Sequence, residues 1–218
     1  MVFLPTTRAV IFANGGLPNP EAARNLIRPD DLLVAADGGS RHALAMGLYP
    51  SVVVGDMDSL SNEAFRVLTQ RGATFLRFPP EKDETDLELA LRYAREQGCR
   101  AILIVAGFGG RNDQTLGNLA LLADPSLDGL DVRMDDGVEQ AFFIRARADI
   151  AGKAGETVSL LPWGGPVDGI ITAGLRYPLR GERLDPFRTR GISNEMLGAT
   201  ASVSIKSGVL LCLHRRND

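Results

Sequence analysis

Aspartates in the first half of the chain gather in short motifs, each of which follows an apolar run. The motifs are Asp37-Gly38-Gly39-Ser40, Gly55-Asp56-Met57-Asp58-Ser59 and Lys82-Asp83-Glu84-Thr85-Asp86. Clustered carboxylates repel one another and raise one another's pKa values unless a cation balances their charge. Mg²⁺ is such a cation, because it prefers hard oxygen ligands and completes its shell with water and substrate phosphate. The set Asp56, Asp58 and Asp86 therefore predicts a magnesium site for a phosphate-bearing substrate, although any one of these aspartates alone also fits a helix cap or a turn.

Glycine-rich segments accompany the aspartates and favour phosphate binding. Glycines lie around Asp37 and before Arg111, where backbone N–H groups can approach phosphate oxygens closely. Arg111 adds a planar cation that suits the same oxygens. Lys82 either reaches the phosphates from its loop or is a solvated surface lysine. Asp113 either caps a helix, contacts the nucleotide or orients Arg111, and His42 is interpreted as structural.

Short β-type runs alternate with helical patterns in the first half, which is typical of a parallel sheet covered by helices. The predicted strands span residues 8–13, 32–36, 51–54, 74–78 and 101–106. The clearest helix begins at a capping box formed by Thr85 and Glu88 and ends at Gly98. A second helix is predicted from about Gln114 to Ala123, and its expected inward residues are Leu116, Leu119, Ala120 and Ala123. Ligands bind at the carboxyl ends of parallel strands, so the loops after these strands should converge at one edge.

Helical periodicity disappears after about residue 131. The strands predicted beyond that point span residues 140–144, 157–161, 170–172, 201–205 and 209–213, and Gly and Pro turns separate them. We therefore predict an α/β fold in which a Rossmann-like parallel-sheet domain, residues 1–140, carries the ATP and metal site. A small all-β domain, residues 141–218, follows it.

Composition and missing motifs exclude several classes of protein. The 218 residues carry 27 acidic and 24 basic side chains, a net charge of −3 that lacks the basic excess of a nucleic-acid-binding protein. No apolar stretch approaches the roughly 20 residues of a membrane span, and residues 1–5 show no secretion signal. The expected location is therefore the cytoplasm, without a membrane partner. Cys99 and Cys212 lack disulfide or metal-ligand spacing and are expected to be buried.

Sequence signatures of the common nucleotide and hydrolase sites are also missing. There is no G-x-x-x-x-G-K-[ST] phosphate loop and no G-x-G-x-x-G dinucleotide fingerprint. The chain has only 2 histidines, which argues against a histidine-rich zinc site and against a Ser-His-Asp triad.

Motifs in both halves, taken in order, closely resemble those of the thiamine pyrophosphokinase family. In the first half they are Asp37-Gly38-Gly39, Gly55-Asp56-Met57-Asp58-Ser59, Lys82-Asp83-Glu84-Thr85-Asp86 and Gly109-Gly110-Arg111-Asn112-Asp113-Gln114. In the second half they are Ser159-Leu160-Leu161-Pro162, Gly174-Leu175-Arg176-Tyr177-Pro178-Leu179 and Ile192-Ser193-Asn194-Glu195. The resemblance implies a catalytic α/β domain, a thiamine-binding β-sandwich and a homodimer. It also implies transfer of a pyrophosphoryl group from ATP to the hydroxyl of thiamine, which gives thiamine diphosphate and AMP.

The resemblance also assigns roles to residues. Asp56, Asp58 and Asp86 would coordinate Mg²⁺, with Asp37 near the same centre, and together with Arg111 they form the expected catalytic set. The expected ATP contacts are Asn14, Lys82, Asp83, Thr85, Arg111, Asp113 and Asn118, whereas Ser193 and Asn194 belong to the thiamine side. Either Asp37 or Asp86 would accept the proton of the thiamine hydroxyl. Gln114 departs from the histidine that many bacterial members carry, so a role for this side chain is in doubt.

Three other functions compete with this interpretation. A haloacid-dehalogenase-like phosphatase would use Asp56 as its nucleophile, because Asp56-Met57-Asp58-Ser59 mimics that motif, but it requires a later lysine such as Lys153 or Lys206. A related pyrophosphokinase would act on a pterin alcohol. A non-catalytic sensor would bind the nucleotide or thiamine without forming AMP.

Overall fold

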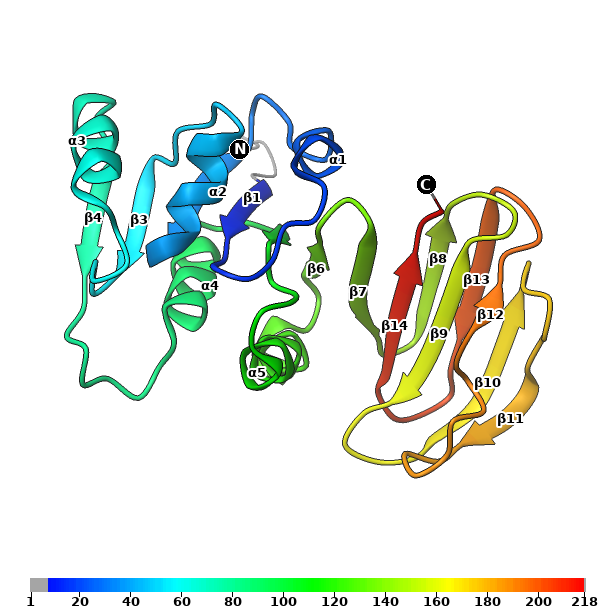
Figure 1. Ribbon diagram of the computed structural model, residues 1–218. Helices are drawn as coiled ribbons and strands as arrows, with labels where there is room; N and C mark the ends of the chain where they lie inside the picture. Colours follow the sequence, from blue (N-terminus) through cyan, green and yellow to red (C-terminus); the bar gives the residue numbers. More distant parts are fainter. Residues whose placement is uncertain (1–7, 218) are drawn as a thin grey trace, which may run out of the picture. The chain divides into compact units, whose positions relative to one another are not determined.

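The computed structural model describes residues 8–217 and divides the chain into two compact units, one ending at Gly137 and the other beginning at Val138 (Figure 1). The predicted boundary, between residues 140 and 141, lies slightly further along the chain. The absence of a secretion signal was predicted from residues 1–5, which lie outside the described part. None of the helices between residues 8 and 217 has the length and apolar character needed to span a membrane.

The first unit is built on a parallel sheet with the strand order β6-β5-β1-β2-β3-β4. The strands are β1 (Arg8–Phe12), β2 (Leu32–Ala36), β3 (Val52–Gly55), β4 (Thr74–Arg77), β5 (Ala101–Val105) and β6 (Asp131–Asp135). The strand order reverses at β1. Strands β2, β3 and β4 follow one another on one side of β1, whereas β5 and β6 lie on its other side. Ligands bind at such a switch point in open α/β sheets.

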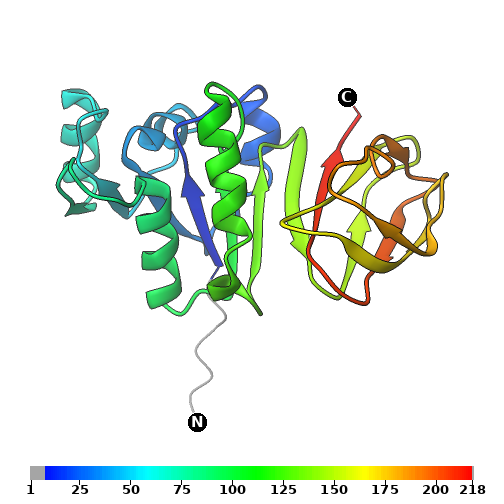
Figure 2. The same ribbon diagram turned by 90° about the horizontal axis from the view of Figure 1, so that it is seen from below.

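Helices cover both faces of this sheet (Figures 1 and 2). They are α1 (Pro20–Arg24), α2 (Ser40–Ala45), α3 (Asn62–Gln70), α4 (Asp86–Glu96) and α5 (Asn112–Leu122), with single turns η1 (Asp37–Gly39) and η2 (Pro125–Leu127). Side chains alternate along a strand, so Val10 and Phe12 of β1 share one apolar cluster with Ala23 of α1 and Ala43 of α2. Helix α4 contacts β1, β2 and β3. Burial on both faces explains why the strands read as continuous apolar runs.

The second unit is a sandwich of two antiparallel sheets. One has the order β12-β9-β14-β7 and the other β11-β10-β13-β8. The strands are β7 (Glu139–Ile144), β8 (Arg147–Ala151), β9 (Thr157–Pro162), β10 (Val167–Ala173), β11 (Arg180–Leu184), β12 (Asn194–Glu195), β13 (Thr200–Ser204) and β14 (Leu210–Arg215). Its core is one cluster that joins Ile144, Leu160 and Leu210 of the first sheet to Ile170 and Val203 of the second. The predicted fold class, an α/β domain followed by a β-sandwich, is confirmed.

Several local predictions are also confirmed. Helix α4 begins after Thr85, whose hydroxyl accepts a 3.2 Å hydrogen bond from the Glu88 N–H, and Gly98 follows its end with φ +79°. Cys99 and Cys212 are both buried, and neither forms a disulfide. Elements α1, α3, β6, β8, β11 and β12 were not predicted from the sequence.

The predicted inward face of α5 is right at Leu119 but wrong at Leu116 and Ala120. Leu116 is 59% exposed and Ala120 is also exposed, whereas Asn118, Leu119 and Leu122 are buried. The helix turns Asn118 inward, where its side-chain amide donates a 2.8 Å hydrogen bond to the Gly107 carbonyl. This rotation satisfies a buried polar group and leaves Leu116 in solvent.

Candidate active site

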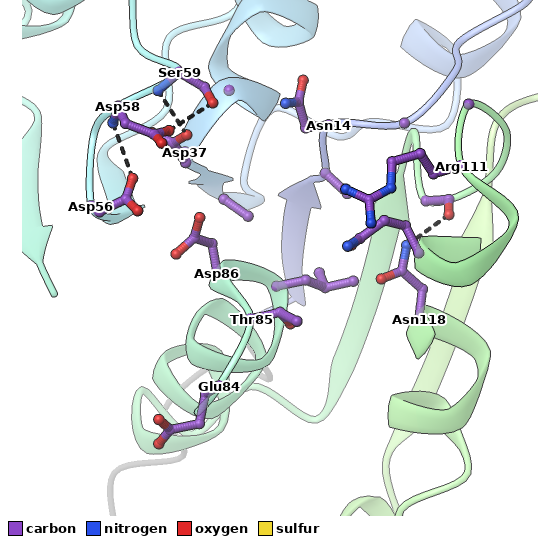
Figure 3. Close-up of a pocket in the computed structure, with 18 of the residues that line it drawn as sticks. Asn14, Asp37, Asp56, Asp58, Ser59, Glu84, Thr85, Asp86, Arg111 and Asn118 are labelled. Carbon is purple, nitrogen blue, oxygen red and sulfur yellow. Dashed lines mark hydrogen bonds between the residues drawn. The ribbon is translucent and has the colours of Figure 1, made fainter. Parts of the chain in front are cut away.

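A cavity of about 570 Å³ lies at the carboxyl ends of the parallel strands in the first unit (Figure 3). Its walls come from the loops after β1 to β5, as the sequence predicts. Predicted site residues that line it are Asn14, Asp37, Asp56, Asp58, Lys82, Thr85, Asp86, Arg111 and Asn118. Gly38, one of the glycines expected to approach phosphate, also lines it, as do Ser59 and Glu84, which had no predicted role. The feature of the sequence that could have identified Ser59 and Glu84 is their position inside the acidic motifs.

Three carboxylates come close together on one side of the cavity. Asp37, Asp56 and Asp58 each offer an oxygen, and these oxygens lie within 4.8 Å of one another. Backbone and hydroxyl groups of the same loop hold them, because the Asp58 N–H donates to Asp56 Oδ1 at 3.0 Å and the Ser59 hydroxyl donates to Asp58 Oδ1 at 2.8 Å (Figure 3). The predicted metal ligands were Asp56, Asp58 and Asp86, with Asp37 near the same centre, whereas in the structure Asp37 takes the place of Asp86 in the group of three.

Asp37 is the buried member of this group. It is only 4% exposed, and its Oδ2 accepts from the Ser59 N–H at 3.2 Å, whereas its Oδ1 has no hydrogen-bond partner among the described residues. Burial raises the pKa of Asp37, the Ser59 hydrogen bonds oppose that rise, and the charge of Asp86 adds to it. A buried carboxylate oxygen without a partner is costly, and a cation at this point would offset the cost. The donor set of hard oxygens therefore fits Mg²⁺.

Asp86 faces the same side of the cavity from the first turn of α4 (Figure 3). Gly55 separates it from Asp37, since a Cβ at position 55 would lie 2.9 Å from Asp37 Cβ and 2.9 Å from Asp86 Cγ. The Lys82 ammonium lies 3.0 Å from Asp86 Oδ1 and 4.0 Å from Asp56 Oδ2. Burial lowers the pKa of Lys82, but the close ion pair with Asp86, together with the charges of Asp56 and Asp37, raises it overall. Lys82 is therefore a cation inside the acidic side of the cavity.

The other side of the cavity carries Asn14, Arg111 and Asn118 (Figure 3). Arg111 lies just before α5 and donates from Nε to Asp113 Oδ1 at 3.1 Å and from Nη2 to Asp113 Oδ2. This pairing raises the pKa of Arg111 and lowers the pKa of Asp113. Asp113 does not line the cavity, so of its alternatives the structure favours orientation of Arg111. Asp83 is exposed and also lies outside the cavity.

His42 packs behind the first loop. Its Nε2 lies 3.0 Å from the Gly15 carbonyl oxygen, and burial lowers its pKa. It does not line the cavity, which agrees with the structural role predicted for it.

Ser193 and Asn194 belong to the second unit. The Asn194 side-chain amide accepts from the Tyr177 N–H at 3.0 Å and donates to the Tyr177 carbonyl at 2.7 Å, so it clamps the loop that carries Tyr177. Ser193 has φ +59°, and its N–H donates to the Ser159 hydroxyl at 3.0 Å. The local structure gives Asn194 a holding role that its sequence motif did not reveal.

Lys153 and Lys206, the lysines that a dehalogenase-like phosphatase would need, both lie in the second unit and do not line the cavity. The lysine that does line it, Lys82, follows β4 in the loop before α4.

Comparison with known proteins gives matches over both units. A model described as "Thiamin pyrophosphokinase, catalytic domain" matches residues 23–134, and one described as "Thiamin pyrophosphokinase, vitamin B1 binding domain" matches residues 144–210. Thiamine pyrophosphokinase of Bacillus subtilis is 28% identical over 184 residues, which cover 84% of this chain and 86% of that protein. Thiamine pyrophosphokinase 1 of Oryza sativa is 24% identical over 213 residues, covering 85% of this chain and 80% of that protein.

Solved structures share the fold over 97% of this chain. The thiamin pyrophosphokinase of Geobacillus thermodenitrificans has a TM-score of 0.83 at 26% identity and covers 97% of this chain and 99% of its own. The Bacillus subtilis structure has a TM-score of 0.86 at 24% identity, with 97% and 100% covered.

Proposed function

Because this chain belongs to the thiamin pyrophosphokinase family, we infer that it transfers the pyrophosphoryl group of ATP to the hydroxyl of thiamine. The thiamine oxygen forms a bond to the β-phosphorus, the bond from that phosphorus to the α–β bridging oxygen breaks, and the hydroxyl proton is lost. The products are thiamine diphosphate and AMP. One observation carries this inference, namely that a catalytic-domain model and a vitamin-B1-binding model match in that order, one in each unit.

We propose that Mg²⁺ is held by Asp56 and Asp58 together with Asp37, and that Asp86 joins them when the nucleotide is bound. The closeness of the first three carboxylates and the unpartnered Asp37 Oδ1 support this assignment. Bound Mg²⁺ would neutralise charge on the phosphate oxygens as it builds up in the transition state. Asp37 or Asp86 would accept the hydroxyl proton, because both face the same side of the cavity.

The remaining cavity residues would position ATP. Arg111, oriented by Asp113, would hold phosphate oxygens, and because α5 begins directly after Arg111, the positive end of this helix would favour the same anions. Asn14, Thr85 and Asn118 line the cavity and would contact the nucleotide. Alignment of the two reacting groups is the main task of such a site, since little covalent chemistry falls to the protein.

Ser193 and Asn194 are proposed for the thiamine side. We expect Asn194 to act by holding the Tyr177 loop, because both ends of its amide already bind Tyr177.

The homodimer that the family resemblance implies is also a proposal. Large apolar side chains on the surface of the second unit support it, namely Tyr177 at 63%, Phe187 at 92% and Leu197 at 62% exposure. Size-exclusion chromatography with light scattering would measure the mass of the protein in solution. The mass of a single chain would contradict the dimer. The cytoplasm stays the predicted location.

The test of function is to incubate the purified protein with ATP, Mg²⁺ and thiamine and to separate the products by chromatography. We expect AMP and thiamine diphosphate in equal amounts. ADP with thiamine monophosphate would instead indicate a single-phosphoryl kinase. AMP formed only with a pterin alcohol would point to the related pyrophosphokinase, and binding without AMP would point to a sensor.

A further inference from the structure

Lys82 places a positive charge among the carboxylates that are proposed to bind Mg²⁺. Its side chain is only 11% exposed, although lysine is usually solvated. The ammonium lies 3.0 Å from Asp86 Oδ1 and 4.0 Å from Asp56 Oδ2, and it donates to the Pro79 carbonyl at 3.4 Å. Two of the carboxylates that face the metal side therefore already have a positive partner within the chain.

A metal ion and the Lys82 ammonium would repel each other if both lay on the acidic side of the cavity. Like charges a few ångströms apart repel strongly in a partly buried site, where water screens them less. Asp86 can bind the ion with full strength only when Lys82 has left it. The lysine is able to leave, because it stands in the loop between β4 and α4 and has a flexible four-carbon stem.

Bound nucleotide would offer the ammonium a second position in the same cavity. Lys82 lines the cavity together with Arg111 and the glycine-rich loop after β5. Phosphate oxygens bound there would attract the ammonium as strongly as a carboxylate does.

We propose that Lys82 is a mobile counter-ion that holds Asp86 in the metal-free protein and moves to the phosphates when nucleotide and metal bind. This inference rests on the proposed function, since it requires a nucleotide in the cavity. Its consequence is coupling: nucleotide removes the competitor of the metal, so each ligand strengthens the binding of the other by the same factor.

The test measures metal binding without turnover. Mn²⁺ serves as the probe, titrated by electron paramagnetic resonance into wild type, Lys82→Gln and Lys153→Gln, alone and with α,β-methylene-ATP, whose α–β bond cannot be cleaved in this way. Lys153 is an exposed lysine of the second unit, so its variant controls for loss of one positive charge.

We expect Lys82→Gln to bind Mn²⁺ alone about fivefold or more tightly than wild type, and to gain less affinity from the nucleotide analogue. Lys153→Gln should match wild type in both measurements. Equal or weaker Mn²⁺ binding by Lys82→Gln in the absence of nucleotide would overturn the proposal. Circular dichroism checks that the variant is folded, and Lys82→Met takes its place if it is not.

The outcome is independent of the product assay. Failure of wild type to form AMP and thiamine diphosphate would contradict the proposed function, whereas the Mn²⁺ titrations alone decide the role of Lys82.

Discussion

Asp37 combines features that rarely occur together in one aspartate. It is buried, it has φ +41°, and one of its carboxylate oxygens has no hydrogen-bond partner among the described residues. A non-glycine residue in the left-handed region and an unpaired buried charge each cost free energy of folding. Such costs are found where function requires them, and here a bound cation would recover the second one.

Replacement of Asp37 by Asn should remove the free-energy cost of the buried charge in metal-free buffer. Burial raises the pKa of Asp37 above its ordinary value of 3.8, so the protonated carboxyl favours folding, and that stability is lost as pH rises through the folded-state pKa. Asn carries no charge and tolerates positive φ. We expect Asp37→Asn with EDTA to raise the free energy of unfolding by about 1 kcal/mol at pH 8 and to have little effect at pH 4.

Urea denaturation at a series of pH values would measure this difference, with the exposed Asp83→Asn as control. An equally large increase in the free energy of unfolding at pH 4 and pH 8 would show that the ionised carboxylate is not the source of the effect.

Asp58 provides the complementary case of an exposed carboxylate. Replacement by Ala removes a proposed metal ligand from the loop after β3 without opening a cavity in the core. We expect turnover to fall by at least about 10²-fold, while the free energy of unfolding changes by less than about 0.5 kcal/mol. Steady-state kinetics and urea denaturation measure the two quantities. Asp30→Ala, an exposed aspartate away from the cavity, is the matched control, and normal activity of Asp58→Ala would refute the metal assignment.

At the scale of elements, the end of β3 sets the spacing of the acidic side. Gly55 is the last residue of β3, has φ +149°, and lies between Asp37, which follows β2, and Asp86, which begins α4. Only a residue without a Cβ lets the strand pass between these two side chains. The missing Cβ at Gly55 therefore lets the end of β3, the turn after β2 and the start of α4 meet at one point.

Replacement of Gly55 by Ala should disturb both stability and metal binding. The new Cβ would meet Asp37 and Asp86 at 2.9 Å in a backbone region that alanine rarely adopts. We expect a loss of about 1–3 kcal/mol in the free energy of unfolding, together with weaker Mn²⁺ binding.

Gly117→Ala is the matched control for this substitution. It lies inside α5 with open space around its Cβ position and should stabilise the protein by roughly 0.5–1 kcal/mol. Urea denaturation compares the two variants, and the same sign for both would contradict the steric argument.

At the scale of the whole molecule, two units with separate cores divide the proposed work. The cavity with its acidic and cationic sides belongs to the first unit, and the clamped Tyr177 loop belongs to the second. Binding of metal and nucleotide should therefore stabilise the first unit directly, because a ligand that binds only the folded state shifts the unfolding equilibrium.

Ligand addition and removal test this division. We expect Mg²⁺ with α,β-methylene-ATP, at about 100 times the dissociation constant, to add about 2.7 kcal/mol to the stability of the first unit. Either ligand alone should add clearly less. EDTA should abolish turnover, and excess Mg²⁺ should restore it. Calorimetry and the product assay measure these effects, and turnover that persists in EDTA would exclude a required metal.

The sequence by itself determined strands β1 to β5, helix α4 and their order along the chain. Apolar runs and capping signals act over a few residues, so the strands from β1 to β5 and the Thr85 cap could be predicted within one or two residues. Because parallel strands end at a common edge, the convergence of their loops could be predicted as well. The family also follows from the order of motifs along the chain.

Only the tertiary structure decided how side chains meet within that edge. It brought Asp37 close to Asp56 and Asp58, placed the Lys82 ammonium on Asp86, and turned Asn118 rather than Leu116 into the interior. These distances depend on strand order, on the left-handed backbone at Asp37 and on the missing Cβ at Gly55. They arise from residues far apart in the chain, and no local pattern of residue types carries that information.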